Sequence, residues 1–251
     1  MGIIHRYFIY LSYNGKKYHG WQIQPNANSV QQVLENCFST LLSEKTAITG
    51  AGRTDTGVHA KLMVAHFDTE NIIDNPKTFV GKLNSFLPRD IAIQKIVPVS
   101  NNAHARFDAV SRTYEYHISL QKNPFLNEFA YQYTGQLDIQ KMNEAAATLF
   151  DYIDFTSFSK LHTDAKTNNC KIMKAVWEQR GETLVFTIQA DRFLRNMVRS
   201  VVGTLLEVGK GKMSIDEFKN VIEKKDRCAA GISMPAQALY LVDIQYPEHI
   251  F

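Results

Sequence analysis

Short connections between predicted strands limit the possible folds of this chain more than any other feature. Residues 171–180 and 183–190 are rich in apolar and β-branched side chains, and only Gly181 and Glu182 separate them. Strands joined so closely must run antiparallel, because a parallel connection needs a crossover of about a dozen residues. We therefore expect an α/β fold of the α+β type, with mixed or antiparallel sheets and helices on one face, and not a doubly wound parallel sheet.

Both helices and strands are predicted in the first part of the chain. Ser29 and Gln32 form a capping box, and apolar side chains then repeat at helical spacing to Leu42. Pro76 is typical of the first turn of a second helix, which we expect to reach about Phe86. Strands are predicted at 7–13, 46–49, 62–68 and 91–99.

The polar stretch 100–102 is the predicted boundary between two domains, residues 1–100 with the loop 50–60, and residues 101–251. In the second domain we expect strands at 112–120, 171–180, 183–190 and 239–246, and helices at 138–150, 191–208 and after Ser214. Both halves mix strands and helices in similar proportion. This predicts two similar α/β domains and is compatible with an old duplication, although no sequence repeat proves one.

The composition excludes several classes of protein. With 45% hydrophobic and 21% charged residues the chain can bury a core, and charged residues interrupt the apolar stretch 193–208 before the roughly 18 residues of a membrane span. The net charge of +3 is too small to identify a nucleic-acid binder. The spacing of the cysteines and histidines argues against disulfides and metal sites; these residues are Cys37, Cys170, Cys228, His59, His66, His104, His117 and His162. We expect a soluble intracellular protein.

A glycine-rich loop with two opposite charges, residues 50–57, is the first candidate site. Arg53 and Asp55 stand among three glycines, so the backbone can approach a ligand closely. The spacing is not that of a dinucleotide fingerprint, which would also open a helix. On the residues alone, turn chemistry favours an Asx turn of Asp55 with Thr56 or Gly57 over a functional carboxylate.

Two tyrosines on one predicted strand are the second candidate. Alternation places Tyr114, Tyr116 and Ile118 on one face of the sheet. Aromatic side chains on a strand resemble a platform for base stacking. Core packing between sheet and helices explains them as well and is the favoured interpretation for an α/β protein.

A basic stripe is the third candidate, on the helix predicted to begin near Asp191. At about 100° per residue Arg192, Arg195 and Arg199 share one side, with Gly203 in line where another backbone could approach. A solvated helix face is the favoured interpretation. Pairing with a carboxylate or with phosphates is the alternative.

These motifs, in this order, resemble the TruA type of tRNA pseudouridine synthase. The similarity covers nearly the whole chain, and its most specific part is the sequence G-A-G-R-T-D-T-G-V-H-A at 50–60. Further matching segments lie at 13–15, 18–25, 83–91, 104–107, 193–205 and 239–242. The chain departs from the family pattern at Arg195, Asn196, Met234 and Ala238, none of which replaces a catalytic residue.

The resemblance implies isomerisation of uridine to pseudouridine at positions 38, 39 and 40 of the tRNA anticodon stem-loop, in a cleft between the domains. Asp55 would be the catalytic nucleophile, kept ionised by Arg199. The target base would be flipped out, with Arg53 filling the vacated space. Tyr114 would stack on the flipped base, and Leu239 would line the opposite wall.

The resemblance also implies a cytoplasmic homodimer that needs neither cofactor nor metal. It leaves open which of the three positions is preferred, which tRNAs are substrates, and whether Asp55 attacks the sugar or the base. Two rival functions remain. A non-catalytic RNA-binding module would have lost the carboxylate, and a dinucleotide-dependent oxidoreductase would place the glycine loop ahead of a helix.

Overall fold

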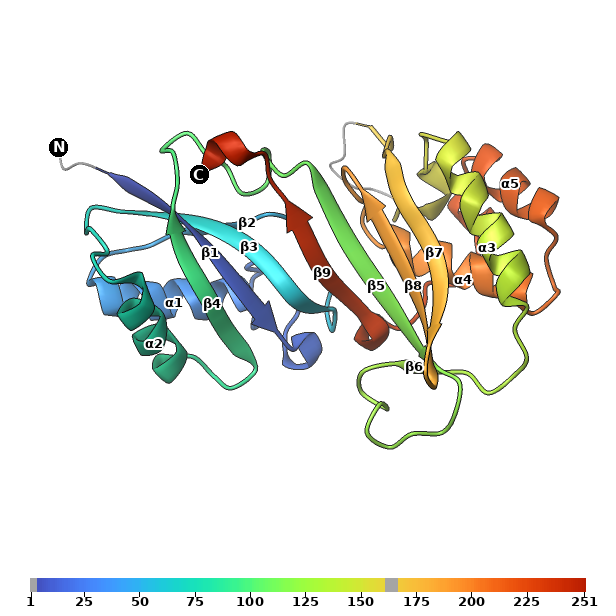
Figure 1. Cartoon of the computed structure of the whole chain (residues 1–251), viewed down its shortest axis with the longest axis horizontal. Coiled ribbons are helices and arrows are strands. Elements are labelled where there is room, and N and C mark those ends of the chain that lie inside the picture. The colour runs from blue at the N-terminus through green and yellow to red at the C-terminus, as the bar shows by residue number, and fades with distance from the viewer. Residues whose placement is uncertain (1–3, 161–166) are drawn as a thin grey trace. The chain divides into compact units, whose positions relative to one another are not determined.

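The computed structural model describes residues 4–160 and 167–251, which form two compact units (Figure 1). Unit 1 comprises Met1–Val110 and Leu241–Phe251, and unit 2 comprises Ser111–Tyr240. These bounds differ from the predicted domains 1–100 and 101–251. The difference has a physical reason, since the Val110 N–H donates to the Gln245 carbonyl (2.9 Å) and the Ser100 N–H to the Ile250 carbonyl (3.2 Å).

Unit 1 is a sheet with helices on one face. Its strand order is β4-β1-β3-β9, and β2 also pairs with β3. The pairs β1–β3, β1–β4 and β2–β3 are antiparallel. The strands are β1 (His5–Tyr13), β2 (Ile48–Gly50), β3 (His59–Thr69), β4 (Ile91–Pro98) and β9 (Leu239–Gln245), and the helices are α1 (Val30–Leu42) and α2 (Pro76–Phe86).

The core of unit 1 lies between the sheet and these helices. Phe38 of α1 meets Phe67 of β3 edge-on, with ring centroids 4.8 Å apart, and also contacts Phe79 of α2. Both helix starts are confirmed. The Ser29 side chain accepts the Gln32 N–H, and Pro76 occupies the first turn of α2.

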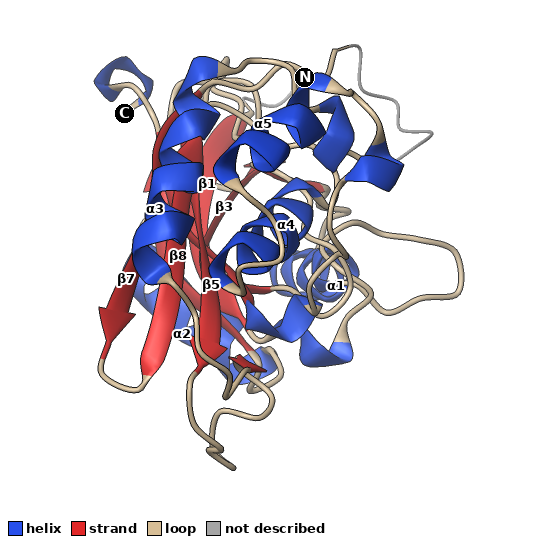
Figure 2. Ribbon diagram, turned by 90° about the vertical axis from the view of Figure 1, so that its right-hand side faces the viewer, coloured by secondary structure: helices blue, strands red, loops and turns tan. Residues whose placement is uncertain are grey.

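Unit 2 places its helices on one face of the antiparallel sheet β5-β8-β7 (Figure 2). The helices α3 (Ile139–Ala147), α4 (Met197–Gly209) and α5 (Ile215–Glu223) pack on one another. The main strands are β5 (Ser111–Ser119), β7 (Ile172–Arg180) and β8 (Thr183–Ala190), and the unpredicted β6 (Tyr131–Gln132) pairs with β5 in parallel. The predicted hairpin and the α+β fold class are confirmed.

The predicted start of the long helix is wrong. α4 begins at Met197 and not near Asp191. The Asp191 carboxylate accepts the N–H groups of Lys171 and Arg192 (both 2.7 Å), which holds the chain in a turn, and Asn196 has a left-handed φ of 67°.

The basic stripe predicted on that helix is therefore absent as such. Arg192 and Arg195 precede the helix, and Arg199 lies in its first turn.

None of the helices in residues 4–160 and 167–251 has both the length and the hydropathy that a membrane span needs.

Candidate active site

The charged loop of unit 1 connects β2 to β3 and holds its two charges on either side of a buried residue. Thr54 is buried, whereas Arg53 is exposed and Asp55 is half-buried. The turn after Asp55 is closed by the main chain, because the Val58 N–H donates to the Asp55 carbonyl (3.1 Å) and Gly57 has a positive φ of 80°. The loop leads directly into a strand.

The segment after β1 supports this loop with backbone hydrogen bonds. The Trp21 N–H donates to the Thr54 carbonyl (3.2 Å), and the Gly57 N–H donates to the Tyr18 carbonyl (3.3 Å). Gly20 has a φ of 88°, and a Cβ there would lie 2.3 Å from the Thr54 carbonyl oxygen. The two chain segments are thus in contact on both sides of Asp55.

Buried side chains complete the support. The Tyr13 hydroxyl and Thr54 Oγ1 share a hydrogen bond of 2.8 Å, and His59 Nδ1 accepts the Gly15 N–H at 3.1 Å. The sequence pattern gave His59 no particular role. Nδ1 can accept this bond only when it carries no proton. The bond connects His59, the first residue of β3, to the segment after β1.

In unit 2 the two tyrosines of β5 have different environments. Tyr116 is fully buried, burial raises the pKa of its hydroxyl, and that hydroxyl donates to the Pro235 carbonyl (3.0 Å). Tyr114 is only half-buried and meets Phe193 edge-on, with ring centroids 5.1 Å apart and planes at 87°. Core packing therefore explains Tyr116, whereas Tyr114 is not fully buried. The sequence pattern did not single out Phe193 as its partner.

Arg199 is held against a loop that follows η4 (Arg227–Ala229). Its Nε donates to the Met234 carbonyl, and the Met234 N–H donates back to the Arg199 carbonyl (3.2 Å). The predicted approach at Gly203 is confirmed, since a Cβ there would lie 2.0 Å from the Ile232 carbonyl oxygen. Further along, Leu239 is buried at the start of β9.

The predicted site residues fall into two groups. Arg53 and Asp55 belong to unit 1, and Tyr114, Arg199 and Leu239 belong to unit 2. Within unit 2, the consecutive residues 234 and 235 bind Arg199 and Tyr116, and thus link the first turn of α4 to β5.

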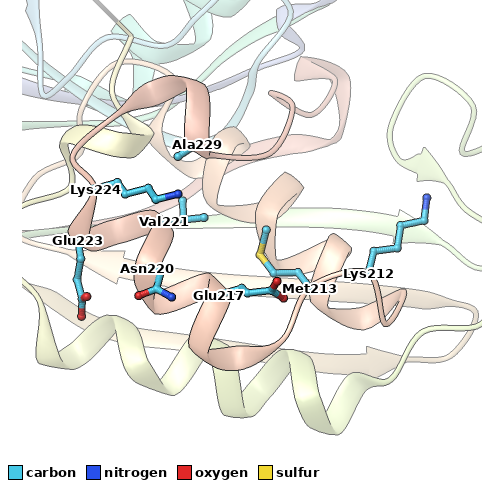
Figure 3. A pocket seen from close by; sticks show the side chains of 8 residues that line it. All are labelled: Lys212, Met213, Glu217, Asn220, Val221, Glu223, Lys224 and Ala229. Carbon is cyan, nitrogen blue, oxygen red and sulfur yellow. The ribbon is translucent and has the colours of Figure 1, made fainter.

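A hollow of about 500 Å³ in unit 2 lies away from these residues (Figure 3). It is formed by α5 and its neighbours, and its lining consists of Lys212, Met213, Glu217, Asn220, Val221, Glu223, Lys224 and Ala229. None of the predicted site residues lines it. No group of three or more His, Cys, Asp or Glu side chains in the described part of the chain is placed to hold a metal ion. His162 lies outside the described residues.

Comparison with known proteins gives consistent similarities along the chain. A family model described as tRNA pseudouridine synthase matches residues 9–108 and 145–247. The tRNA pseudouridine synthase A of Parabacteroides distasonis is 61% identical, with 98% of each chain covered, and that of Bacteroides fragilis is 59% identical, with 99% of each covered. The Shewanella amazonensis protein of the same name is 39% identical over 95% of this chain and 92% of its own.

Proposed function

The chain belongs to the tRNA pseudouridine synthase family, and from this premise we propose that it converts uridine to pseudouridine at positions 38, 39 and 40 of the tRNA anticodon stem-loop. As a family member it is an isomerase that acts on tRNA. The observation that carries the catalytic assignment is the Arg53–Asp55 loop, which hydrogen bonds from the segment after β1 support on both sides of the carboxylate.

Asp55 is the proposed nucleophile. The isomerisation breaks the bond between N1 of uracil and C1′ of ribose and forms a bond between C5 and C1′. N1 gains a proton and C5 loses one, so the reaction needs no oxidant or cofactor. An ionised carboxylate can attack the nucleoside or take up the proton. Hydrogen bonds hold the loop backbone, so the main chain at Asp55 is in place before the substrate binds.

Arg199 is the proposed charge partner of Asp55. A guanidinium near a carboxylate favours its ionised form. The hydrogen bond from Nε to the Met234 carbonyl fixes the direction of the Arg199 side chain, so its position depends on the segment that packs on α4. The pairing of Arg199 with Asp55 is part of this proposal.

The remaining residues handle the flipped base. A uridine in a stem or stacked loop must leave the stack before a carboxylate can reach it. Arg53 is exposed beside the nucleophile and would fill the vacated space. The half-buried Tyr114 ring would stack on the extruded uracil, and Leu239 would line the other side. We also expect a cytoplasmic homodimer.

The rival functions fit the site less well. A dinucleotide-binding loop delivers phosphates to the N-terminus of a helix, whereas this loop leads into β3. A pure RNA-binding module has no use for a carboxylate at the centre of a supported loop.

The test is to incubate the protein with unmodified tRNA transcripts and to map pseudouridine by carbodiimide adduct formation. We expect product at positions 38, 39 and 40 where uridine is present, and none in matched transcripts with cytidine at these positions. Product confined to other positions would refute the assigned site, and the absence of product in all tRNAs would refute the activity.

Asp55→Asn should abolish pseudouridine formation while tRNA binding is largely kept. The amide keeps the size of the carboxylate but is neither a nucleophile nor a base. Product formation and tRNA affinity should be measured on the same preparation. Turnover well above contaminating activity would contradict the nucleophile assignment, and a changed melting temperature would show that the substitution acts on folding.

A further inference from the structure

Phe107 is a large apolar side chain in unit 1 that is 75% exposed. It lies in the connection between β4 and β5, in a motif, His104-Ala105-Arg106-Phe107, to which the proposed chemistry gives no role. Single exposed apolar residues are common on protein surfaces. The turn that carries Phe107 is held by side-chain hydrogen bonds, both within the turn and to other elements of unit 1.

Hydrogen bonds within the turn hold the backbone that carries Phe107. The N–H groups of Arg106 and Phe107 both donate to His104 Nδ1, at 3.1 and 3.3 Å. The Asp108 carboxylate accepts the His104 N–H (2.6 Å), and the Asp108 N–H donates to the His104 carbonyl (3.1 Å). The imidazole of His104 lies 4.2 Å from the Phe107 ring, centroid to centroid.

The turn is also bonded to the sheet and to the end of the chain. The buried His66 of β3 accepts the Ala105 N–H through Nδ1 (3.1 Å), and its ring lies 4.7 Å from that of His104. The Tyr246 hydroxyl donates to the Ala105 carbonyl (2.6 Å), and Arg6 donates to the Ala103 carbonyl (2.9 Å). The exposed Phe107 is thus carried by a turn that is hydrogen-bonded to β1, to β3 and to the C-terminal segment.

The Phe107 ring has charged neighbours in the chain, Arg106 before it and Asp108 after it. The Arg106 guanidinium lies 6.0 Å from the centre of the Phe107 ring, within cation–π range. A flat ring beside a guanidinium matches a nucleotide, whose base stacks on the ring and whose phosphate attracts the cation. Aromatic residues and arginine also occur in protein–protein interfaces, so the test below includes a measurement of the oligomeric state.

We propose that Phe107 and Arg106 form a stacking site for an unpaired base of the bound tRNA, separate from the uridine that reacts. This rests on the proposed function, since it takes tRNA as the substrate. A site that only binds should lower the affinity for tRNA when it is removed, and it should leave the rate at saturating tRNA unchanged.

The experiment measures tRNA affinity at several salt concentrations for Phe107→Ala, Phe107→Trp and Arg106→Gln. The matched control is Ile72→Ala, which removes a 64% exposed apolar side chain of the same unit. Phe107→Ala should weaken binding about 5- to 100-fold, with the salt dependence unchanged and kcat kept. Phe107→Trp should restore affinity, because it keeps an aromatic face. Arg106→Gln should make the salt dependence shallower by about one unit at most, and the control should bind like the unaltered protein.

Two results would overturn the proposal. One is unchanged affinity in Phe107→Ala. The other is a change in oligomeric state, measured by analytical ultracentrifugation, without loss of affinity in the assembled form, which would show that the ring contacts protein. The stacking site is judged by affinity and the proposed function by pseudouridine formation in the unaltered protein, so the failure of one is distinguishable from the failure of the other.

Discussion

Tyr114 and Tyr116, on the same face of β5, show how much the environment of a residue decides its role. Tyr116 has its hydroxyl bound to the Pro235 carbonyl and its ring fully buried. Tyr114 touches Phe193 with its ring edge-on and stays half-buried. Identical side chains therefore have different environments, a fully buried one for Tyr116 and a half-buried one for Tyr114.

Tyr114→Ala should weaken capture of the flipped uridine by about 1 to 3 kcal/mol, because a stacked base is lost. The salt dependence of tRNA binding should stay the same, since no charge is removed. Tyr114→Phe keeps the ring and tests whether the hydroxyl takes part in proton transfer. The measurement is single-turnover kinetics over a range of protein concentrations.

Tyr116→Phe is the control for this experiment. It leaves the half-buried Pro235 carbonyl without its donor and should cost about 1 kcal/mol of stability with little effect on base capture. Full activity in Tyr114→Ala would contradict the stacking role and would leave core packing as the explanation of Tyr114.

The arginines should separate by role. Arg199→Ala should lower both turnover and stability, by about 1 to 3 kcal/mol for the latter, because the Met234 carbonyl loses its donor. Arg53→Ala should slow turnover with little change in stability, since Arg53 is exposed. Thermal melting and turnover of both variants check this division. Equal melting temperatures would count against it.

At the scale of the element, α4 depends on close backbone contact with the loop after η4. Gly203 allows this contact because the Ile232 carbonyl occupies the space of a side chain. Gly231 matches it from the other side, where a Cβ would lie 2.9 Å from the Thr204 nitrogen. The position of Arg199 is thus set by a glycine one turn further along its helix.

Gly203→Ala should therefore be destabilising by about 1 to 3 kcal/mol and should also reduce turnover through displacement of the loop that holds Arg199. Gly81→Ala on α2 is the matched control. A Cβ at Gly81 meets nothing within 4 Å, so the better helix former should stabilise the protein by about 0.5 to 1 kcal/mol. Urea denaturation of both variants gives the comparison. A neutral Gly203→Ala would mean that the loop can move away at no cost.

Local chemistry made some elements predictable from the sequence. The Ser214 capping box is present in full, and Pro76 lies in the first turn of α2 as expected. The start of α4 was not predictable in this way, because the turn before it depends on hydrogen bonds between Asp191 and the distant residue Lys171. Hydrophobic periodicity reports a helix but not the tertiary contact that delays its beginning.

The residues of the candidate site show the same difference between local patterns and tertiary contacts. The glycine-rich loop with Arg53 and Asp55 is recognisable in the sequence as a candidate site, whereas the role of Asp55 follows only from the resemblance to the family. The residues that support the loop, Tyr13 and His59, act through contacts between segments far apart in the chain, and no local pattern reveals which partner each will find.

At the scale of the whole molecule, protonation of His66 makes the free energy of unfolding depend on pH. Burial, with Arg6 and His104 nearby, lowers its pKa from 6.5 to about 4. The unfolded chain therefore binds a proton at His66 more readily than the folded protein does. The stabilisation from this residue is complete above about pH 6.5 and is lost as the pH falls toward 4.

The stability of the protein should thus fall by about 3 kcal/mol between pH 7 and pH 4 on account of His66. His66→Asn retains an acceptor for the Ala105 N–H but cannot titrate, and should flatten the dependence over this window. Urea midpoints at pH 7, 5.5 and 4.5 for both proteins test this. Parallel curves would show that another group is responsible.

The path of the chain through unit 1 has a consequence for biosynthesis. Residues 241–251 complete the unit that carries Asp55, with Tyr246 and Phe251 packed edge-on against Phe8. All of residues 111–240 are translated between the two parts of unit 1. The N-terminal part of unit 1 therefore emerges from the ribosome before residues 241–251 are synthesised. Unit 2 is a continuous stretch of the chain, whereas the unit with the proposed nucleophile is completed only by residues that are synthesised after unit 2.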